Sequence, residues 1–115
     1  MTNSYKRNIV YLDEYLNIKA GDYMGMSETL KAISDPVRRE ILNLLKDGKK
    51  TAGEIVEHFN LSGATVSHHL ATLRKAGLIV ETKYKQFIYY ELNISVFEEV
   101  LIWIKGLGGD FNEKN

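Results

Sequence analysis

Residues 51–77 constrain the fold of this chain more than any other stretch, because they join two short helical patterns through a very short connection. Thr51 and Glu54 have the T-x-x-E spacing of a capping box, which predicts that the first helix begins at Ala52. Two short helices connected in this way are typical of a helix-turn-helix, in which the second helix is the recognition helix.

The connection itself is predicted from the residues that end one helix and begin the next. Asn60 suits the left-handed conformation that ends a helix, and Leu61 is then expected to point inward. Ser62 is expected to cap the second helix, and Gly77 to end it. The buried stripe of that helix is predicted at the i, i+4, i+7 positions Val66, Leu70 and Leu73.

The opposite face of the second helix is small, hydroxylic or able to donate hydrogen bonds, and it carries no acidic residue. Such a face suits a DNA major groove, because small residues let the backbone approach and Ser, Thr and His can contact base edges or phosphates. An ordinary solvated face is the alternative, but it would normally carry several Glu. The face comprises Ala64, Thr65, His68, Ala71, Thr72 and Lys75, flanked by Gly63, Ser67, Arg74 and His69.

After Gly77 the pattern changes to the period of two that is typical of strands. Residues 78–83 and 86–92 are β-branched and aromatic, which predicts a hairpin with Tyr84 and Lys85 at its tip. A basic hairpin directly after a recognition helix is a wing, in which Lys83 and Lys85 would contact phosphate. Alternatively, these lysines only protect an exposed sheet edge.

Two helices are predicted before residue 51. Residues 27–33 form a short helix with Leu30 and Ile33 inward, and Gly21 and Gly25 break the chain before it. Asp35 and Pro36 then start a helix that runs to about Lys46. Two arginines follow Pro36, in a first turn that does not favour cations. Arg38 is therefore expected to form a structural ion pair with a carboxylate such as Asp35 or Glu54, and a phosphate contact is the alternative.

The last helix is predicted to open at Ser95, which forms a second capping box with Glu98. It is apolar on more than one face, so one stripe can close over the core while the surplus faces a partner surface, most simply a second subunit. The residues expected at this dimer interface, including those from preceding helices, are Leu12, Leu16, Leu30, Phe97, Leu101, Trp103 and Ile104.

The 115 residues are divided into an N-terminal extension (1–25, with a helix over 4–18), a winged helix-turn-helix domain (26–109) and a tail (110–115). No signal or membrane-spanning segment is evident, so the protein is expected in the cytoplasm. The net charge is zero, which argues weakly against nucleic acid. Residues 62–90 nevertheless hold four basic residues against one acidic residue, a local surplus that can attract DNA.

Several motifs in this order resemble the ArsR/SmtB family of winged-helix repressors. They are Ala32-Ile-Ser-Asp-Pro-Val-Arg-Arg-Glu-Ile-Leu42, Ser67-His-His-Leu70, Leu73-Arg-Lys-Ala-Gly-Leu-Ile79 and Tyr89-Tyr-Glu-Leu92. Within the family, the chain looks most like the SdpR autorepressor subgroup. The resemblance implies a mainly α fold with a small hairpin, and a homodimer that pairs through its first and last helices. It also implies repression at a two-fold symmetric operator of double-stranded DNA.

The residues expected to contact DNA lie on the helix-turn-helix and the wing. They are Thr51, Ser62, Gly63, Ala64, Thr65, Ser67, His68, His69, Arg74, Lys83 and Lys85.

No metal or other cofactor is expected. Metal sensors of the family carry cysteines on the helix that corresponds to residues 52–59, or pair Asp and His with His and Glu on the last helix, and neither pattern is present. His68 and His69 are adjacent and point about 100° apart, so they cannot chelate one ion. The resemblance instead implies relief of repression by a membrane-protein anti-repressor.

Two other classes of function compete with DNA-dependent repression. A winged helix used for protein interaction, with weak or lost DNA binding, is favoured a little by the neutral charge and the apolar extension. An enzyme is disfavoured, because no nucleophile–base pair, phosphate loop or carboxylate dyad has a useful spacing. A repressor induced by a small molecule stays open.

Overall fold

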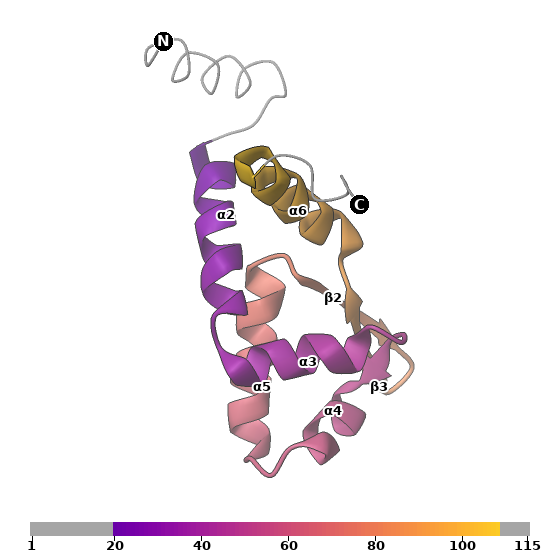
Figure 1. The fold of residues 1–115 in the computed structure, drawn as a ribbon. Coiled ribbons are helices and arrows are strands. Elements are labelled where there is room, and N and C mark those ends of the chain that lie inside the picture. Colours follow the sequence, from indigo (N-terminus) through magenta and orange to yellow (C-terminus); the bar gives the residue numbers. More distant parts are fainter. Residues whose placement is uncertain (1–19, 109–115) are drawn as a thin grey trace, which may run out of the picture.

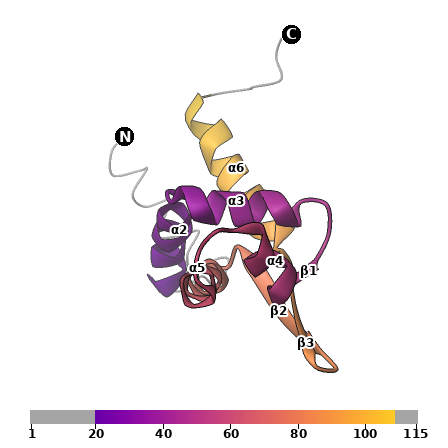
Figure 2. The ribbon, with the colours of Figure 1, turned by 90° about the horizontal axis from the view of Figure 1, so that it is seen from below.

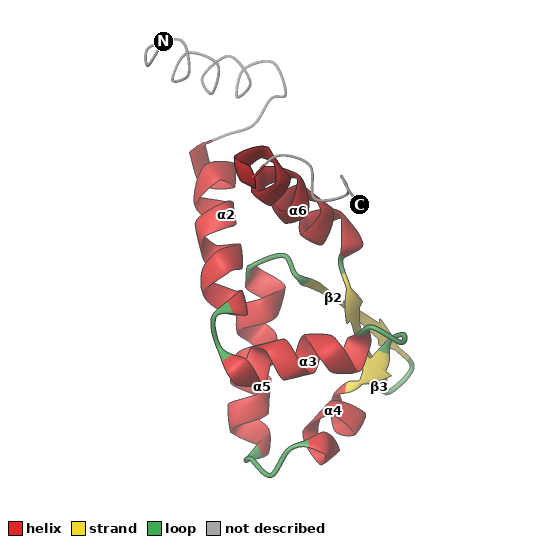
Figure 3. Ribbon diagram, viewed as in Figure 1, coloured by secondary structure: helices red, strands yellow, loops and turns green. Residues whose placement is uncertain are grey.

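The computed structural model describes residues 20–108, with side chains from residue 25 onward. The predicted helix over 4–18, and Leu12 and Leu16 within it, lie outside this range. Figures 1 and 3 show a group of helices with a small sheet at one side. The elements in chain order are α2 (Ala20–Ile33), α3 (Pro36–Leu45), β1 (Lys50–Thr51), α4 (Ala52–His58), α5 (Gly63–Lys75), β2 (Ile79–Tyr84), β3 (Phe87–Leu92) and α6 (Ile94–Gly108).

The core forms where α3, α4 and α5 meet the base of the sheet. The predicted stripe of α5 is confirmed, because its three apolar residues are all buried. On α3, Ile41 and Leu45 are buried, whereas Val37 and Leu44 pack at the margin. The largest fully buried side chains of the described residues are Ile41, Ile55, Leu73, Leu78 and Val66.

Helix α2 is longer than the sequence predicted. It runs through Gly21 and Gly25, so the breaks expected there were wrong. A glycine inside a helix costs only about 1 kcal/mol relative to alanine, which packing of the helix against α3 and α5 can offset. Leu30 is 38% exposed rather than inward, and Thr29 and Ala32 are buried in its place.

The turn between α4 and α5 also differs from expectation. Helix α4 is followed by its C-cap residue Phe59, which has an extended backbone. Among the described non-glycine residues only Lys85 has a positive φ, so Asn60 is not left-handed. The left-handed conformation predicted for Asn60 was therefore wrong. Because the chain leaves α4 extended, Phe59 packs against the core and Leu61 is 41% exposed. The inward position expected for Leu61 was therefore also wrong.

The sheet has the strand order β1-β3-β2, and both pairings are antiparallel. The predicted hairpin is confirmed, with Tyr84 opposite Phe87 at its end and Lys85 in the turn at φ 58°. The two-residue strand β1 was not predicted; it pairs Thr51 with Tyr89 and so ties the start of α4 to the wing. Figure 2, viewed from below, shows the hairpin extending away from the helices.

Helix α6 begins at Ile94, so Ser95 lies in its first turn and not at its N-cap, where the sequence placed it. The residue before the helix, Asn93, donates from Nδ2 to the carbonyl of Gly77 at 3.0 Å, which fixes the entry to α6 on the end of α5. No helix among residues 20–108 is both long and apolar enough to span a bilayer.

Candidate nucleic-acid interface

The N-terminal turn of α5 is closed by Ser62, as predicted. The Ser62 hydroxyl oxygen accepts a hydrogen bond from the backbone N–H of Thr65 at 3.0 Å and donates to the Thr65 hydroxyl at 2.8 Å. One capping side chain cannot satisfy every free N–H group of a first turn. The end of α5 therefore presents backbone donors toward solvent, where an anion can bind them.

The predicted face of α5 opposite the core is open to solvent at its N-terminal end and at Lys75, whereas Ala71 and Thr72 are half-buried. Its predicted contact residues Ser62, Gly63, Ala64, Thr65, Ser67 and His68 are all exposed. A Cβ placed on Gly63 would have no atom within 4 Å, so packing inside the protein does not require glycine there. No residue of α5 is acidic, and Arg74 and Lys75 lie in its last turn. The face can therefore approach a polyanion without charge repulsion from its own side chains.

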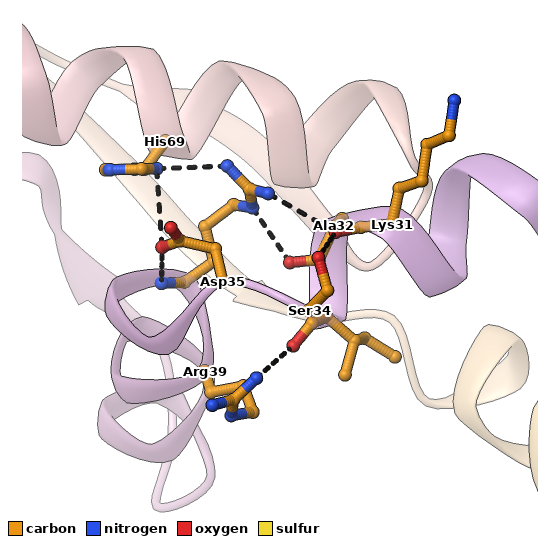
Figure 4. A network of polar contacts seen from close by, with 8 residues as sticks. Lys31, Ala32, Ser34, Asp35, Arg39 and His69 are labelled. Atoms are coloured by element: carbon orange, nitrogen blue, oxygen red, sulfur yellow. Dashed lines mark hydrogen bonds and ion pairs between the residues drawn. The ribbon is translucent and has the colours of Figure 1, made fainter.

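His69 is turned toward the protein instead. Its side chain is 15% exposed, and its Nδ1 lies 3.2 Å from Nη1 of Arg38 and 3.9 Å from Oδ2 of Asp35 (Figure 4). The expected carboxylate partner of the Arg38 side chain was wrong. That side chain donates to the carbonyls of Ala32 and Lys31 at the end of α2, where the helix dipole favours a cation.

Asp35 caps α3 as predicted. Its Oδ2 accepts a hydrogen bond from the backbone N–H of Arg38 at 3.0 Å. This hydrogen bond is the main reason that the pKa of Asp35 lies below its ordinary value, and the nearby positive charge of the Arg38 side chain lowers it further. The carboxylate is thus held in its charged form between α3 and α5.

Thr51 completes the predicted capping box of α4. Its hydroxyl oxygen accepts from the backbone N–H of Glu54 at 3.1 Å, and the Glu54 carboxylate accepts from the backbone N–H of Thr51 at 2.8 Å. The second bond lowers the pKa of Glu54. Thr51 is half-buried, and its hydroxyl oxygen is engaged in the hydrogen bond from Glu54.

The wing is joined to the end of α5 by an ion pair between Arg74 and Glu81, whose Nε and Oε1 atoms are 3.1 Å apart. Burial and the neighbouring Glu81 raise the pKa of Tyr90 on the same sheet. Lys83 and Lys85 are exposed, and Lys85 places its Nζ 5.4 Å from the ring centre of Tyr84. Among the described residues, neither lysine takes part in an ion pair.

Sequence reasoning missed an aromatic surface on one side of the wing. Phe87 and Tyr89 lie edge to face with ring centres 6.4 Å apart, and Lys49 places its Nζ 5.1 Å from the centre of the Tyr89 ring. Alternation along β3 puts these rings on one face, since residues two apart share a side of a strand. That alternation could have identified the pair, but the position of Lys49 depends on β1.

The residues predicted at a dimer interface are mostly exposed in the single chain. Leu30, Leu101, Trp103 and Ile104 are between 38% and 53% exposed, whereas Phe97 packs against the core. Ile102 and Leu107 are also exposed on α6. Several large apolar side chains on one helix are available for a partner surface.

The described part of the chain holds no group of three or more side chains suited to bind a metal ion. His58 pairs with Glu40 at 3.0 Å, and His69 approaches Asp35, but each is only a pair. The whole sequence has no cysteine. The residues therefore do not fit a thiolate metal site.

Comparison with known proteins agrees with this architecture. Residues 35–80 match the family "Bacterial regulatory protein, arsR family". The chain is 51% identical over 79 residues to the transcriptional repressor SdpR of Bacillus subtilis, covering 69% of this chain and 88% of that protein. It is 35% identical over 79 residues to the arsenical resistance operon repressor of Staphylococcus aureus, covering 69% and 76% respectively.

A solved structure of a possible transcriptional regulator for arsenical resistance superposes with a TM-score of 0.64 at 29% identity, covering 72% of this chain and 86% of that one. The predicted winged helix-turn-helix is confirmed by this likeness, and the chain is a DNA-binding regulator rather than an enzyme. The recognition helix, the wing and these relatives together show that the chain belongs to the ArsR family of bacterial transcriptional regulators.

Proposed function

We propose that this protein is a homodimeric, sequence-specific transcriptional repressor that acts in the cytoplasm without a thiolate metal-sensing site. The observation that carries the proposal is the exposed face of α5, which is free of acidic residues and lies beside a wing bearing exposed lysines. The similarity to the transcriptional repressor SdpR supports repression. Autoregulation is a further part of the proposal.

The DNA contacts follow from the geometry of α5. Its N-terminal turn enters the major groove, where backbone N–H groups hold a phosphate and Gly63 and Ala64 allow close approach. Thr65, Ser67 and His68 face base edges or phosphates. Each is exposed, and His68 has no hydrogen bond among the described residues, so its ring nitrogens are free for DNA.

Four other residues have different roles in this proposal. Lys83 and Lys85 contact phosphate from the wing, because they are exposed and carry no ion-pair partner in the described structure. Thr51 and Arg74 contact DNA less directly, since the Thr51 hydroxyl accepts a hydrogen bond from Glu54 and the exposed Arg74 side chain is paired with Glu81.

Dimerisation brings two recognition helices to one operator. The exposed apolar residues of α6, with Leu30 of α2, form the shared surface. Two-fold pairing would place the helices in successive major grooves, about 34–36 Å apart. A membrane-protein anti-repressor is the proposed source of relief, as the resemblance to the SdpR subgroup implies, and a chain without cysteine is compatible with it.

Selection from a pool of random DNA duplexes tests the proposal without knowledge of the operator. The full chain should enrich an inverted repeat with half-sites about one helical turn apart. A Trp103→Glu variant should lose both the dimer in sedimentation and the enrichment, because a charge on an apolar interface opposes pairing. Enrichment of no sequence by the folded, dimeric wild type would contradict the proposal and favour a protein-interaction module.

A further inference from the structure

Arg38 connects three helices through one guanidinium group. Its Nε donates to the carbonyl of Ala32 at 2.8 Å and its Nη2 to that of Lys31 at 3.3 Å, so it closes the end of α2. Its Nη1 lies 3.2 Å from Nδ1 of His69 on α5 (Figure 4). The last turn of α2 and the middle of the recognition helix are thus linked through one α3 side chain.

The chemistry of this contact fixes the protonation of the ring. A guanidinium group can only donate hydrogen bonds, so the nitrogen that faces it must accept. Neutral His69 therefore carries its hydrogen on Nε2, on the side of the ring away from Arg38. The Asp35 carboxylate, 3.9 Å from Nδ1, stands next to the same contact and is held by the backbone of Arg38.

A second link holds the other end of the recognition helix to α2. The hydroxyl of Thr29 donates to the carbonyl of Ala76, the C-cap of α5, at 2.8 Å. Thr29 is 4% exposed and is the only buried polar residue in the described part of the chain. With links at the middle and at the end, α5 can change its tilt relative to α2 only if one of them breaks.

We propose that Arg38 and His69 are positioning residues that set the tilt of the recognition helix, and thereby its sequence specificity, through a His69 ring held as the Nε2–H tautomer. Neither side chain reads a base in this proposal. It rests on the proposed DNA-binding function, and it explains why a half-buried histidine stands beside the exposed His68.

Nitrogen NMR of the imidazole rings tests the tautomer in the free protein. In mildly alkaline buffer, where histidine rings are neutral, a long-range proton–nitrogen spectrum distinguishes the two tautomers. The signals of His69 are assigned by their absence from the spectrum of His69→Asn. We expect them to show the Nε2–H form alone. Arg38→Met should give a mixture of both forms. A mixture in the wild type, or no change in Arg38→Met, would overturn the proposal.

Arg39 provides a matched control for the effect on DNA. It lies on the same helix and donates to the carbonyl of Ile33 at 2.8 Å, but among the described residues its side chain forms no hydrogen bond or ion pair with α5. The quantity to measure is the affinity for the duplex selected from random DNA divided by the affinity for a scrambled duplex. Arg38→Met should lower this affinity ratio about tenfold, the effect of one misaligned base contact. Arg39→Met should change the ratio less than about twofold. An equal loss of the affinity ratio in both variants would show that the hydrogen bonds to the end of α2 are responsible. The contact with His69 would then play no part, which would overturn the proposal.

Two His69 variants separate positioning from direct contact and leave the α2 carbonyl bonds of Arg38 in place. His69→Asn keeps a hydrogen-bond acceptor near the position of Nδ1 and should retain the affinity ratio. His69→Leu has no acceptor, and its affinity ratio should be about tenfold lower. An equal loss in both would mean that Nε2 contacts DNA directly and would overturn the positioning role. A wild type with no preference between duplexes would refute the proposed function instead, and the NMR result on the tautomer would still stand.

Discussion

Arg74 and Glu81 join the recognition helix to the wing through an ion pair 3.1 Å long, across the turn that contains Gly77. Both side chains are well exposed, so the pair should contribute no more than about 1 kcal/mol to stability. Its larger consequence is electrostatic. Glu81 is the only acidic residue between Ser62 and Tyr90, and it pairs with Arg74, which flanks the proposed DNA-binding face of α5.

The Glu81→Gln variant should therefore bind all DNA sequences more tightly. With Arg74 released, the slope of log affinity against log salt should steepen by about one unit, the effect of one added phosphate contact. Fluorescence anisotropy at several salt concentrations measures this slope. Glu91→Gln is the matched control, since Glu91 is exposed on β3 and forms no ion pair in the described structure. An unchanged slope in Glu81→Gln would show that Arg74 does not reach phosphate.

Removal of charge from the wing should have the opposite effect. Lys83→Gln and Lys85→Asn should each weaken binding to every duplex and flatten the salt slope by about one unit. Asparagine is chosen at position 85 because Lys85 has a φ of 58°, which asparagine tolerates better than most residues. Lys46→Gln, an equal charge change at the exposed end of α3, should leave the slope near the wild-type value. A wild-type slope in both wing variants would remove the wing from the interface.

Loss of His68 should affect discrimination rather than stability. The ring is exposed, and its centre lies 5.8 Å from that of His69. His68→Ala should weaken specific binding by about 1–3 kcal/mol and leave binding to scrambled DNA nearly unchanged. His58→Ala, which removes an exposed histidine from α4, is the control. If both variants kept full discrimination, His68 would not belong to the reading surface.

The Asp35 cap predicts how stability depends on pH. Asp35→Ala should lower the free energy of unfolding by about 0.5–2 kcal/mol at neutral pH, through loss of the N-cap of α3. The hydrogen bond from Arg38 lowers the pKa of Asp35 in the folded state. The charged carboxylate therefore stabilises the fold above the unfolded pKa of about 3.9 and loses this effect as the pH falls through the folded value.

Urea unfolding of the wild type and Asp35→Ala, from neutral pH into the acid range, measures this dependence. The difference between the two proteins should shrink below about pH 4. Asp35→Asn keeps a capping oxygen without the charge, so its difference from the wild type isolates the electrostatic part. A difference between wild type and Asp35→Ala that stays constant into acid would contradict the role assigned to the charge.

Most features that depend on local chemistry could be predicted from the sequence, although the cap expected at Ser95 and the left-handed Asn60 were wrong. The caps at Asp35, Thr51 and Ser62 were found because an N-cap needs only a short polar side chain at one position. The stripe of α5 and the hairpin followed from periodicity over enough residues to be distinctive. The exposed face of α5 followed from the position of its buried face.

Features that depend on tertiary packing could not be predicted in this way. Gly21 and Gly25 lower the intrinsic helix propensity of α2, yet contacts with other helices extend it. Strand β1 has only two residues, too few for a period. Arg38 was assigned a nearby carboxylate, because nothing in the sequence connects it to His69, which lies 31 residues away. This link also explains why His69, unlike its neighbour His68, does not face solvent.

The most direct test of this account is the preference of the full chain for DNA from upstream of its own gene. Fluorescence anisotropy would compare that labelled duplex with a scrambled duplex of the same composition across a range of salt. We predict a preference of about 10³ or more, with affinities for both duplexes that fall steeply as salt rises. Weak and equal binding to both, by a protein that also selects no sequence from random DNA, would contradict the assignment of α5 as a recognition helix.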